Sequence, residues 1–406
     1  MTSQGHVYNR QEIQHETRAR LLMKIGVVVF CRLVLNTARR FAYPFAPVLS
    51  RELGVPLTAI TSLIAVNWST SVLGFVFGPV ADRFGYRNMM IIGMVLLAVG
   101  MLAGGWFPIY SVMVIALFLA GMGKIVFDPA VQAYIGEQVP YQRRGMAIGW
   151  IEISWAGSTL LGIPIIALLI DNLGWRSPFF AMGAMGILGA LAMIAFVPAA
   201  GQSRSRPSGA LPFVRMMQNM IQDRHSLGAM SYVFFFSAAV DNLFVIYGAW
   251  LEKAFDVGMV ALGLGTSVIG VAELLGEILV ATISDRFGLK RVVNLGVICC
   301  IITYSLLPFV SRSVYLAMAA LFVHFLIFEF TIISSVALCT ELQPGSRATV
   351  IAGFFAAAGL GRICGALIGG PIWLNGGIFL TSMVSAGLTV FALASLHWGL
   401  HGWNKD

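Results

Sequence analysis

The chain has 406 residues, of which 58% are hydrophobic and 11% are charged, and its formal net charge is +8. Soluble proteins carry about 25% charged residues, so this composition excludes an ordinary soluble domain. The apolar runs are too continuous for the alternating strands of a membrane barrel, which leaves membrane-spanning helices. At roughly 20 residues per span, about 12 helices fit into the chain.

The apolar segments divide the chain into two halves. Residues 1–20 form a polar tail without a cleavable signal, so the first apolar run is expected to remain a span. Six spans are predicted in a first bundle (21–198), at 21–47, 57–80, 88–107, 110–135, 144–170 and 177–196. A polar linker rich in Gly, Ser and Pro (199–225) separates this bundle from a second one (226–400). Its six spans are predicted at 226–251, 259–283, 290–309, 312–337, 346–372 and 376–397, before a short tail at 401–406.

A charged loop occurs twice at half the chain length. The first copy, between the second and third spans, contains Gly78, Asp82, Arg83, Gly85 and Arg87. The second copy, 203 residues later, contains Asp285, Arg286, Gly288, Lys290 and Arg291. A second pattern repeats at a shift of 204, since Glu137-x-x-Pro140-x-x-Arg143 returns as Glu341-x-x-Pro344-x-x-Arg347. Two agreeing repeats indicate two related bundles, and six helices in each give both the same orientation.

The basic residues are distributed unequally between the two sets of loops. The loops on the side of both termini contain most of the Lys and Arg residues outside the spans. Cytoplasmic loops carry such an excess, so both termini are expected in the cytoplasm, and the positive net charge needs no nucleic-acid partner. The five cysteines all lie in apolar segments, with spacings that fit neither a disulfide framework nor a metal site.

The loop from Gly78 to Arg87 resembles the signature of the major facilitator superfamily between its second and third helices. The second copy departs from the family pattern at Ala281, where the family often has Gly. The resemblance covers residues 21–400 and implies secondary transport by two bundles that rock about a central cavity. It also implies that the charged loops clamp the bundles together when the outer side is open. The alternative is a basic turn that only fixes topology.

The fifth predicted span contains Gly157, Gly162 and Pro164. This pattern is similar to the antiporter signature of drug-efflux members of the family, although Ile163 separates Gly162 from Pro164. Glycines let helices approach closely, and proline allows a bend. The pattern therefore favours export over import, and the alternative is ordinary packing of small residues.

Ionisable side chains inside the membrane mark functional sites by default. At about 100° per residue, the polar residues of the first span form one stripe, with a further arginine beside it: Arg32, Asn36, Arg39, Arg40 and Tyr43. Further polar residues lie in the fourth, seventh and tenth spans: Lys124, Asp128, Asp241, Asn242, His324 and Glu329. The family resemblance implies that these four helices line the central cavity.

Two interpretations of these charges remain open. In the first, the basic face of the first span binds an anionic or zwitterionic substrate while carboxylates of the second bundle carry protons. In the second, the basic and acidic faces pair across the cavity, because a buried unpaired charge is strongly unfavourable. Burial can bring a carboxyl pKa towards working pH, and the candidates for proton coupling are Asp241, Glu329 and Glu152. Glu273 and Glu277 are expected to share a proton or to pair with Arg362.

The sequence thus predicts a monomeric secondary transporter of 12 helices in the inner or plasma membrane. Its expected substrate is a small organic molecule, exported by alternating access in exchange for protons. An importer or facilitator of an organic anion is the alternative, and a receptor or scaffold without transport activity is a third. The sequence shows no phosphate loop, metal cluster or nucleophile–base pair, so neither an enzyme nor a cofactor is expected.

Overall fold

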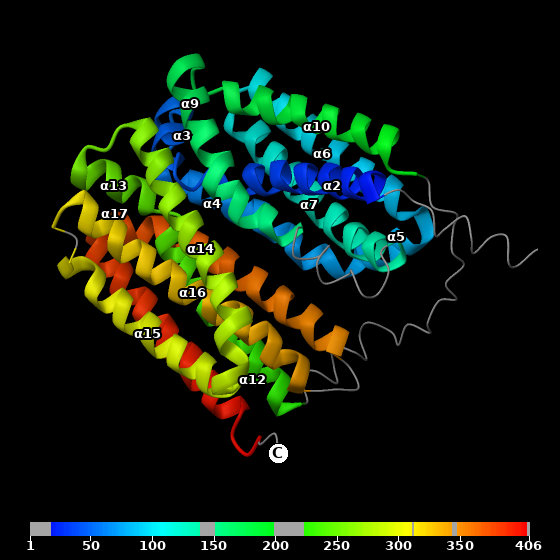
Figure 1. Cartoon of the computed structure of the whole chain (residues 1–406). Helices are drawn as coiled ribbons and strands as arrows, with labels where there is room; N and C mark the ends of the chain where they lie inside the picture. Colours follow the sequence, from blue (N-terminus) through cyan, green and yellow to red (C-terminus); the bar gives the residue numbers. More distant parts are fainter. Residues whose placement is uncertain (1–17, 139–150, 199–222, 311, 343–346, 404–406) are drawn as a thin grey trace, which may run out of the picture.

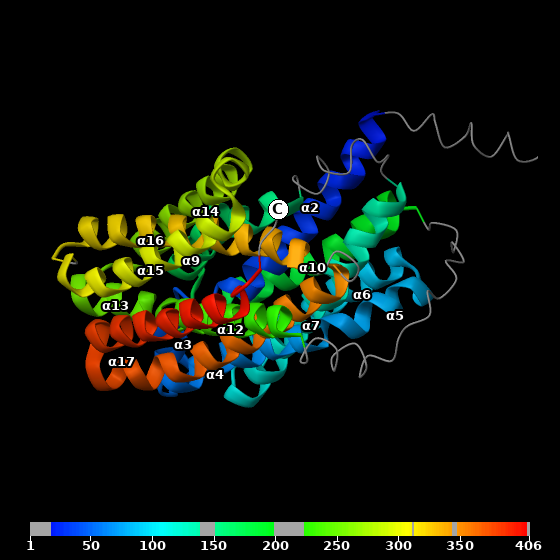
Figure 2. The same ribbon diagram turned by 90° about the horizontal axis from the view of Figure 1, so that it is seen from below.

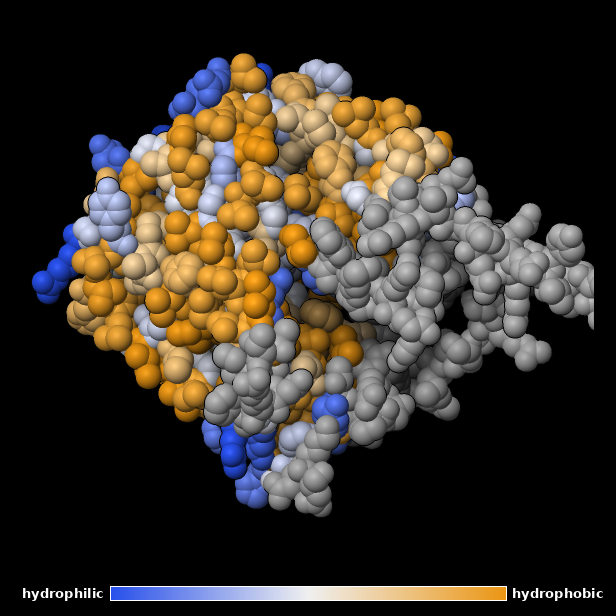
Figure 3. All heavy atoms as spheres, in the orientation of Figure 1, coloured by the Kyte–Doolittle hydropathy of each residue, from blue (hydrophilic) through white to orange (hydrophobic). Residues whose placement is uncertain are grey.

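The computed structural model describes residues 18–138, 151–198, 223–310, 312–342 and 347–403, and all regular structure in these ranges is helical (Figure 1). The helices of residues 18–198 pack together as one group, and those of residues 223–403 as a second (Figures 1 and 2). We call them the first and the second bundle. The surface is mostly hydrophobic in the space-filling view, as expected of a protein surrounded by lipid (Figure 3).

The first bundle contains α2 (Arg18–Arg40), α3 (Ala46–Leu53), α4 (Leu57–Ser69), η2 (Thr70–Leu73), α5 (Gly74–Phe84), α6 (Tyr86–Trp106), α7 (Tyr110–Gln138), the span Ile151–Leu173 with a π-helical turn η3 (Ser158–Gly162) before α9 (Ile163–Leu173), and α10 (Ser177–Phe196). The second bundle contains α12 (Arg224–Phe244), α13 (Tyr247–Phe255), α14 (Met259–Phe287), α15 (Leu289–Val310), α16 (Val314–Leu342) and α17 (Arg347–Gly399).

Within the described ranges, 9 helices are long and apolar enough to cross a membrane, or 10 if the bent pair of α3 with the helix from 57 to 73 is one span. The helix α2 is not among them, and its last turns carry Arg39 and Arg40. The long helix α17 covers both of the last predicted spans, with a break at Gly377, where φ is 57° and ψ is −154°. An all-helical membrane protein is therefore confirmed, whereas the number 12 stays a prediction.

Several predicted spans are interrupted. The first, predicted at 21–47, ends its helix at Arg40, and residues 41–45 form turns before α3 begins at Ala46. Pro44 explains this break, because proline lacks a backbone N–H and disfavours the helical conformation of the residue before it. The seventh span is likewise divided after Phe244, and the part of the fifth at 144–150 lies outside the described residues.

The two charged loops have matching backbones. Gly85 ends α5 with φ 87° and ψ 135°, and Gly288 ends α14 with φ 81° and ψ 126°. Only glycine adopts this region without steric cost, so the repeated glycine is a requirement of the turn. The side chains of Asp82, Asp285 and Arg286 lie outside what the structure describes, as does the burial of Gly78, while Arg83 and Arg291 are exposed.

The basic residues after these glycines make equivalent contacts. Arg87 donates a hydrogen bond of 2.6 Å to the backbone oxygen of Ile194, near the end of α10. Lys290 donates bonds of 3.2 Å and 3.0 Å to the backbone oxygens of Leu400 and Trp403, which follow α17. In each bundle the loop is therefore hydrogen-bonded to the end of the last helix of its own bundle. The two copies of the loop share this contact as well as their sequence pattern.

Candidate substrate cavity

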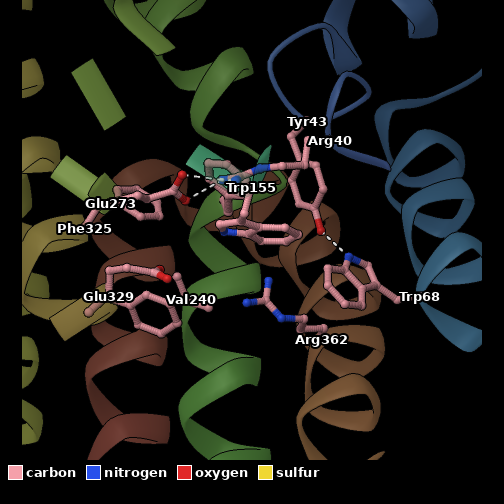
Figure 4. Close-up of a pocket in the computed structure, with 11 residues that line it drawn as sticks. Arg40, Tyr43, Trp68, Trp155, Val240, Glu273, Phe325, Glu329 and Arg362 are labelled. Carbon is pink, nitrogen blue, oxygen red and sulfur yellow. Dashed lines mark hydrogen bonds and ion pairs between the residues drawn. The ribbon is translucent and has the colours of Figure 1, made fainter. Parts of the chain in front are cut away.

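A small cavity of about 20 Å³, room for about one water molecule, lies between the two bundles. Its lining residues come from six helices, the turns at 41–45 and the span Ile151–Leu173: Arg40, Tyr43, Trp68, Trp155, Val240, Phe244, Glu273, Phe325, Phe328, Glu329 and Arg362. Aromatic rings and charged groups alternate around it (Figure 4). Such a mixture suits a small amphipathic solute, because ligand sites combine apolar walls with a few polar groups.

The bundles meet closely at the end of the molecule opposite the N-terminal end of α2. There Arg51 forms an ion pair of 2.6 Å with Glu252 of the other bundle. A Cβ at Gly248 would lie 2.2 Å from the backbone oxygen of Pro44, and one at Gly263 would lie 2.3 Å from Cβ of Ala167. The cavity is therefore closed at this end, which we call the closed end.

Asp241 joins the two bundles through a chain of hydrogen bonds. Trp68 donates from Nε1 to the hydroxyl of Tyr43, which donates to Asp241 Oδ1 at 2.6 Å. Arg362 donates from Nη1 to Asp241 Oδ2 at 2.8 Å. The Asp241 side chain is fully buried. Its charge is balanced by Arg362 of its own bundle and stabilised by the hydrogen bond from Tyr43 of the other.

Arg40 also binds across the cavity. Its guanidinium donates two hydrogen bonds to Glu273, and Thr159 donates a third to the same carboxylate at 3.1 Å. Arg40 also lies over the ring of Trp155, at 4.5 Å from its centroid. Pairing across the cavity is thus present for this arginine, whereas the expected pairing of Glu273 with Arg362 is wrong (Figure 4).

Arg32 of the polar stripe pairs within the first bundle. Arg32 contacts Asp128 at 3.2 Å and Glu152 at 3.0 Å, and Lys124 contacts Asp128 at 2.6 Å. Asn36 donates to Ser154 at 3.2 Å. Glu152 is therefore a partner of an arginine, and these residues form a separate polar cluster that does not line the cavity described above.

Among the described residues, two buried charged side chains lack an ionic partner. Arg39 is 4% exposed, donates to the hydroxyl of Ser71 at 2.7 Å and lies 3.9 Å over the ring of Trp68. Its Nε has no hydrogen-bond partner. Glu329 is 8% exposed and lines the cavity, and no ion pair or hydrogen bond joins its carboxylate to the described residues.

Two residues expected in the cavity lie elsewhere. Asn242 donates to the backbone oxygen of Thr381 and to Ser385, inside the second bundle. His324 contacts Thr303 at 2.8 Å and packs against a tyrosine ring, also inside the second bundle. Consecutive residues of a helix point about 100° apart. Asp241 therefore faces Tyr43 and Arg362, whereas Asn242 faces the part of α17 that follows Gly377.

The glycines of the fifth span pack against α2. A Cβ at Gly162 would lie 2.2 Å from the hydroxyl oxygen of Thr37, and one at Gly157 would lie 3.3 Å from Leu33. Pro164 follows the π-helical turn, where an irregular helix is expected. These residues shape the helix behind the cavity and do not line it.

The sequence did not single out several apolar lining residues and one hydroxyl, namely Val240, Phe244, Phe325, Phe328 and Ser71. Their spacing from the charged residues could have indicated them, since Phe244 follows Asp241 by three positions and Phe325 precedes Glu329 by four.

Among the described residues no group of three His, Cys, Asp or Glu side chains could hold a metal.

Comparison with known proteins shows which family the chain is similar to. Residues 28–224 match the model described as Major Facilitator Superfamily. The uncharacterized MFS-type transporter YceJ of Bacillus subtilis is 23% identical over 84% of this chain and 86% of its own length. A multi-drug resistance efflux pump PmrA homolog of Lactococcus lactis is 21% identical over 89% of this chain and 90% of its own length.

Solved structures agree on the fold. The nucleoside transporter NupG superposes with a TM-score of 0.78 at 13% identity, over 94% of this chain and 100% of that one. The family match and the full-length relatives point to transport and away from enzyme activity. By sequence, residues 28–224 match the major facilitator superfamily, and the similarity to the MFS-type transporter YceJ extends over 84% of the chain.

Proposed function

We propose that the chain is a proton-coupled exporter of a small organic solute, working by alternating access. The contacts of Asp241 carry this proposal, because one carboxylate accepts hydrogen bonds from Tyr43 of the first bundle and Arg362 of the second. A proton on Asp241 removes the charge that holds both donors. Proton binding would then weaken a contact between the bundles, which is what coupling requires.

The proposal includes the topology. Twelve spans in two repeats of six, at residues 21–198 and 226–400, place both termini in the cytoplasm and the protein as a monomer in the inner or plasma membrane. The closed end is then the outer end, and the cavity belongs to an inward-facing state. The charged loops at 78–87 and 281–291 would clamp the bundles on the cytoplasmic side after the outer end opens. Similarity to the Lactococcus lactis efflux pump homolog supports export.

The experiment is transport in proteoliposomes. A panel of radiolabelled organic acids, amines and neutral solutes is tested with and without an imposed pH gradient, in wild type and in Asp241→Asn. The wild type should move a solute against its gradient only when a pH gradient is present. The variant should lose this response and keep solute exchange. Asp171→Asn is the matched control, because Asp171 is exposed near the end of α9.

A response to the pH gradient that survives in Asp241→Asn would remove this residue as the proton site. Wild-type transport that ignores the pH gradient would instead favour the second candidate function, facilitated import of an organic anion. Arg39 favours that candidate, since it has no carboxylate partner among the described residues.

A further inference from the structure

Two guanidinium groups converge on one indole at the side of the cavity formed by Trp68. Arg39 lies 3.9 Å and Arg362 lies 4.5 Å from the centroid of this ring. The carboxylate of Asp241 binds Arg362 and Tyr43, and no hydrogen bond links it to Arg39. Two positive charges are thus accompanied by one negative charge.

The other buried carboxylates nearby are occupied. Asp128 pairs with Arg32 and Lys124, and Glu273 pairs with Arg40. Glu329 projects into the cavity from the side opposite Trp68 (Figure 4). Among the described residues, no carboxylate is therefore in contact with Arg39, although an arginine stays charged in proteins.

Arg39 is poorly satisfied as well as unpaired. Its only hydrogen bond to a described residue is the one to Ser71, and its buried Nε has none. A buried charge is costly unless it is paired and hydrogen-bonded. A site with one excess positive charge and unused N–H donors is complementary to a single anionic group that accepts two hydrogen bonds.

This site is shared between the bundles. Arg39 and Ser71 belong to the first bundle, and Arg362 belongs to the second. Gly359 lies one turn before Arg362, and a Cβ there would come within 2.8 Å of Cβ of Ser71. An anion held between the two arginines would consequently contact both bundles where their backbones are close.

We propose that Arg39 and Arg362, with Ser71 and Trp68, bind the carboxylate of a monoanionic organic substrate, a proposal that rests on the proposed function. The apolar body of the substrate extends towards Trp155, Phe244 and the other rings of the cavity, which has a volume of about 20 Å³ here and must widen to receive it. One excess positive charge matches a carboxylate better than a doubly charged phosphate ester. Because the subsite joins both bundles, substrate binding favours the state in which they are together.

Benzoate, benzamide, benzylamine and phenyl phosphate are the probes, because they share one ring and differ in charge. Equilibrium binding of radiolabelled benzoate and the unfolding temperature are measured on the purified full chain. Benzoate should bind the wild type and raise its unfolding temperature, benzamide and benzylamine should do neither, and phenyl phosphate should compete less well.

Arg39→Gln should weaken benzoate binding by about tenfold or more, because charge-assisted hydrogen bonds are lost. The same substitution should raise the unfolding temperature of the ligand-free protein, since it removes an unpaired buried charge. A structural ion pair would give the opposite shift. Arg39→Lys keeps the charge without the planar fork and should bind benzoate with intermediate affinity. Arg176→Gln is the control, because Arg176 lies near the closed end and lines no cavity.

Three results overturn the proposal: no binding of benzoate to the wild type, equal binding to Arg39→Gln, or stronger stabilisation by benzylamine than by benzoate. If Arg39→Gln does not fold, Arg39→Lys and Ser71→Ala decide by the same readouts. Proton-coupled transport of a neutral or cationic solute would refute the carboxylate subsite and leave the proposed function intact. Benzoate binding without any response of transport to a pH gradient would refute the proposed function and leave the carboxylate subsite intact.

Discussion

The closed end offers a steric test at a position where the two bundles nearly touch. Gly263 in α14 faces Ala167 in α9, and a Cβ on Gly263 would lie 2.3 Å from Cβ of Ala167. Two carbon atoms rest at about 3.5–4.0 Å, so the substitution Gly263→Ala requires the helices to separate locally by more than about 1 Å. The two bundles are expected to part at the closed end as a result.

The expected size of the effect follows from overpacking. An extra methyl group in a well-packed site costs about 1–3 kcal/mol, and this cost falls only on the closed state. A difference of this size corresponds to a shift of about 5- to 150-fold in the ratio of open to closed molecules. The double substitution Ala167→Gly/Gly263→Ala removes the opposing methyl group and should restore the original ratio.

The assay is a distance distribution between spin labels at Glu52 in α3 and Ala254 in α13, both exposed near the closed end. The five native cysteines are first replaced, so that only the labelled positions react. Gly258→Ala serves as control, because nothing lies within 4 Å of a Cβ at that glycine. An unchanged distribution in Gly263→Ala, or a shift that the double substitution does not reverse, would refute the steric argument.

Three further predictions concern the charged residues. Asp241→Asn should abolish the dependence of proteoliposome transport on a pH gradient while exchange continues, and a retained dependence would contradict the role of Asp241. Glu329→Gln permanently imitates the protonated acid in the cavity, so initial transport rates measured across a pH series should lose their pH dependence if Glu329 is the titrating group; an unchanged profile would exclude it. Arg40→Gln leaves Glu273 buried without its cation and should lower stability by about 3–5 kcal/mol, seen as a lower unfolding temperature. Replacing both members of that pair by Gln should recover most of the loss, and no recovery would show that the pair is not the cause.

Much of the fold could be predicted from the sequence, because lipid imposes a simple rule on long apolar segments. The span predicted at 177–196 coincides with α10, and those predicted for α6 and α15 differ by one or two residues at each end. The repeated glycines also gave correct turns at Gly85 and Gly288. Such features are local, and local sequence is enough to specify them.

The interruptions were harder to predict. Pro44 accounts for the turns at residues 41–45, but a proline can also bend a helix without ending it, and here Pro44 lies beside Gly248 of the second bundle. The π-helical turn at Ser158–Gly162 likewise accompanies a contact with Glu273 that is distant in sequence. Contacts between bundles decide these details, and a single sequence does not show them.

The sequence predicted which residues lie near the cavity better than it predicted which of them pair with one another. Arg40, Tyr43, Asp241 and Glu329 were expected near the cavity and are found there or in contact with its lining. The choice of partners was not predictable, since Glu273 pairs with an arginine 233 positions earlier in the chain. The facing direction of adjacent polar residues was also missed at Asn242, because periodicity alone does not say which of two neighbours faces the cavity.

The small residues at the closed end have a consequence for the speed of the movement. Gly248 and Gly263 bring the two bundles together without interlocking side chains at these two contacts. Surfaces that interlock must change rotamers and repack when they part, and that repacking adds a barrier. Smooth surfaces of backbone and methyl groups can separate as rigid bodies, so the closed end should open on the microsecond-to-millisecond timescale of domain movements. The separation of the bundles would then be limited by the contacts of Arg40 with Glu273 and of Tyr43 with Asp241, which must break each time the bundles part.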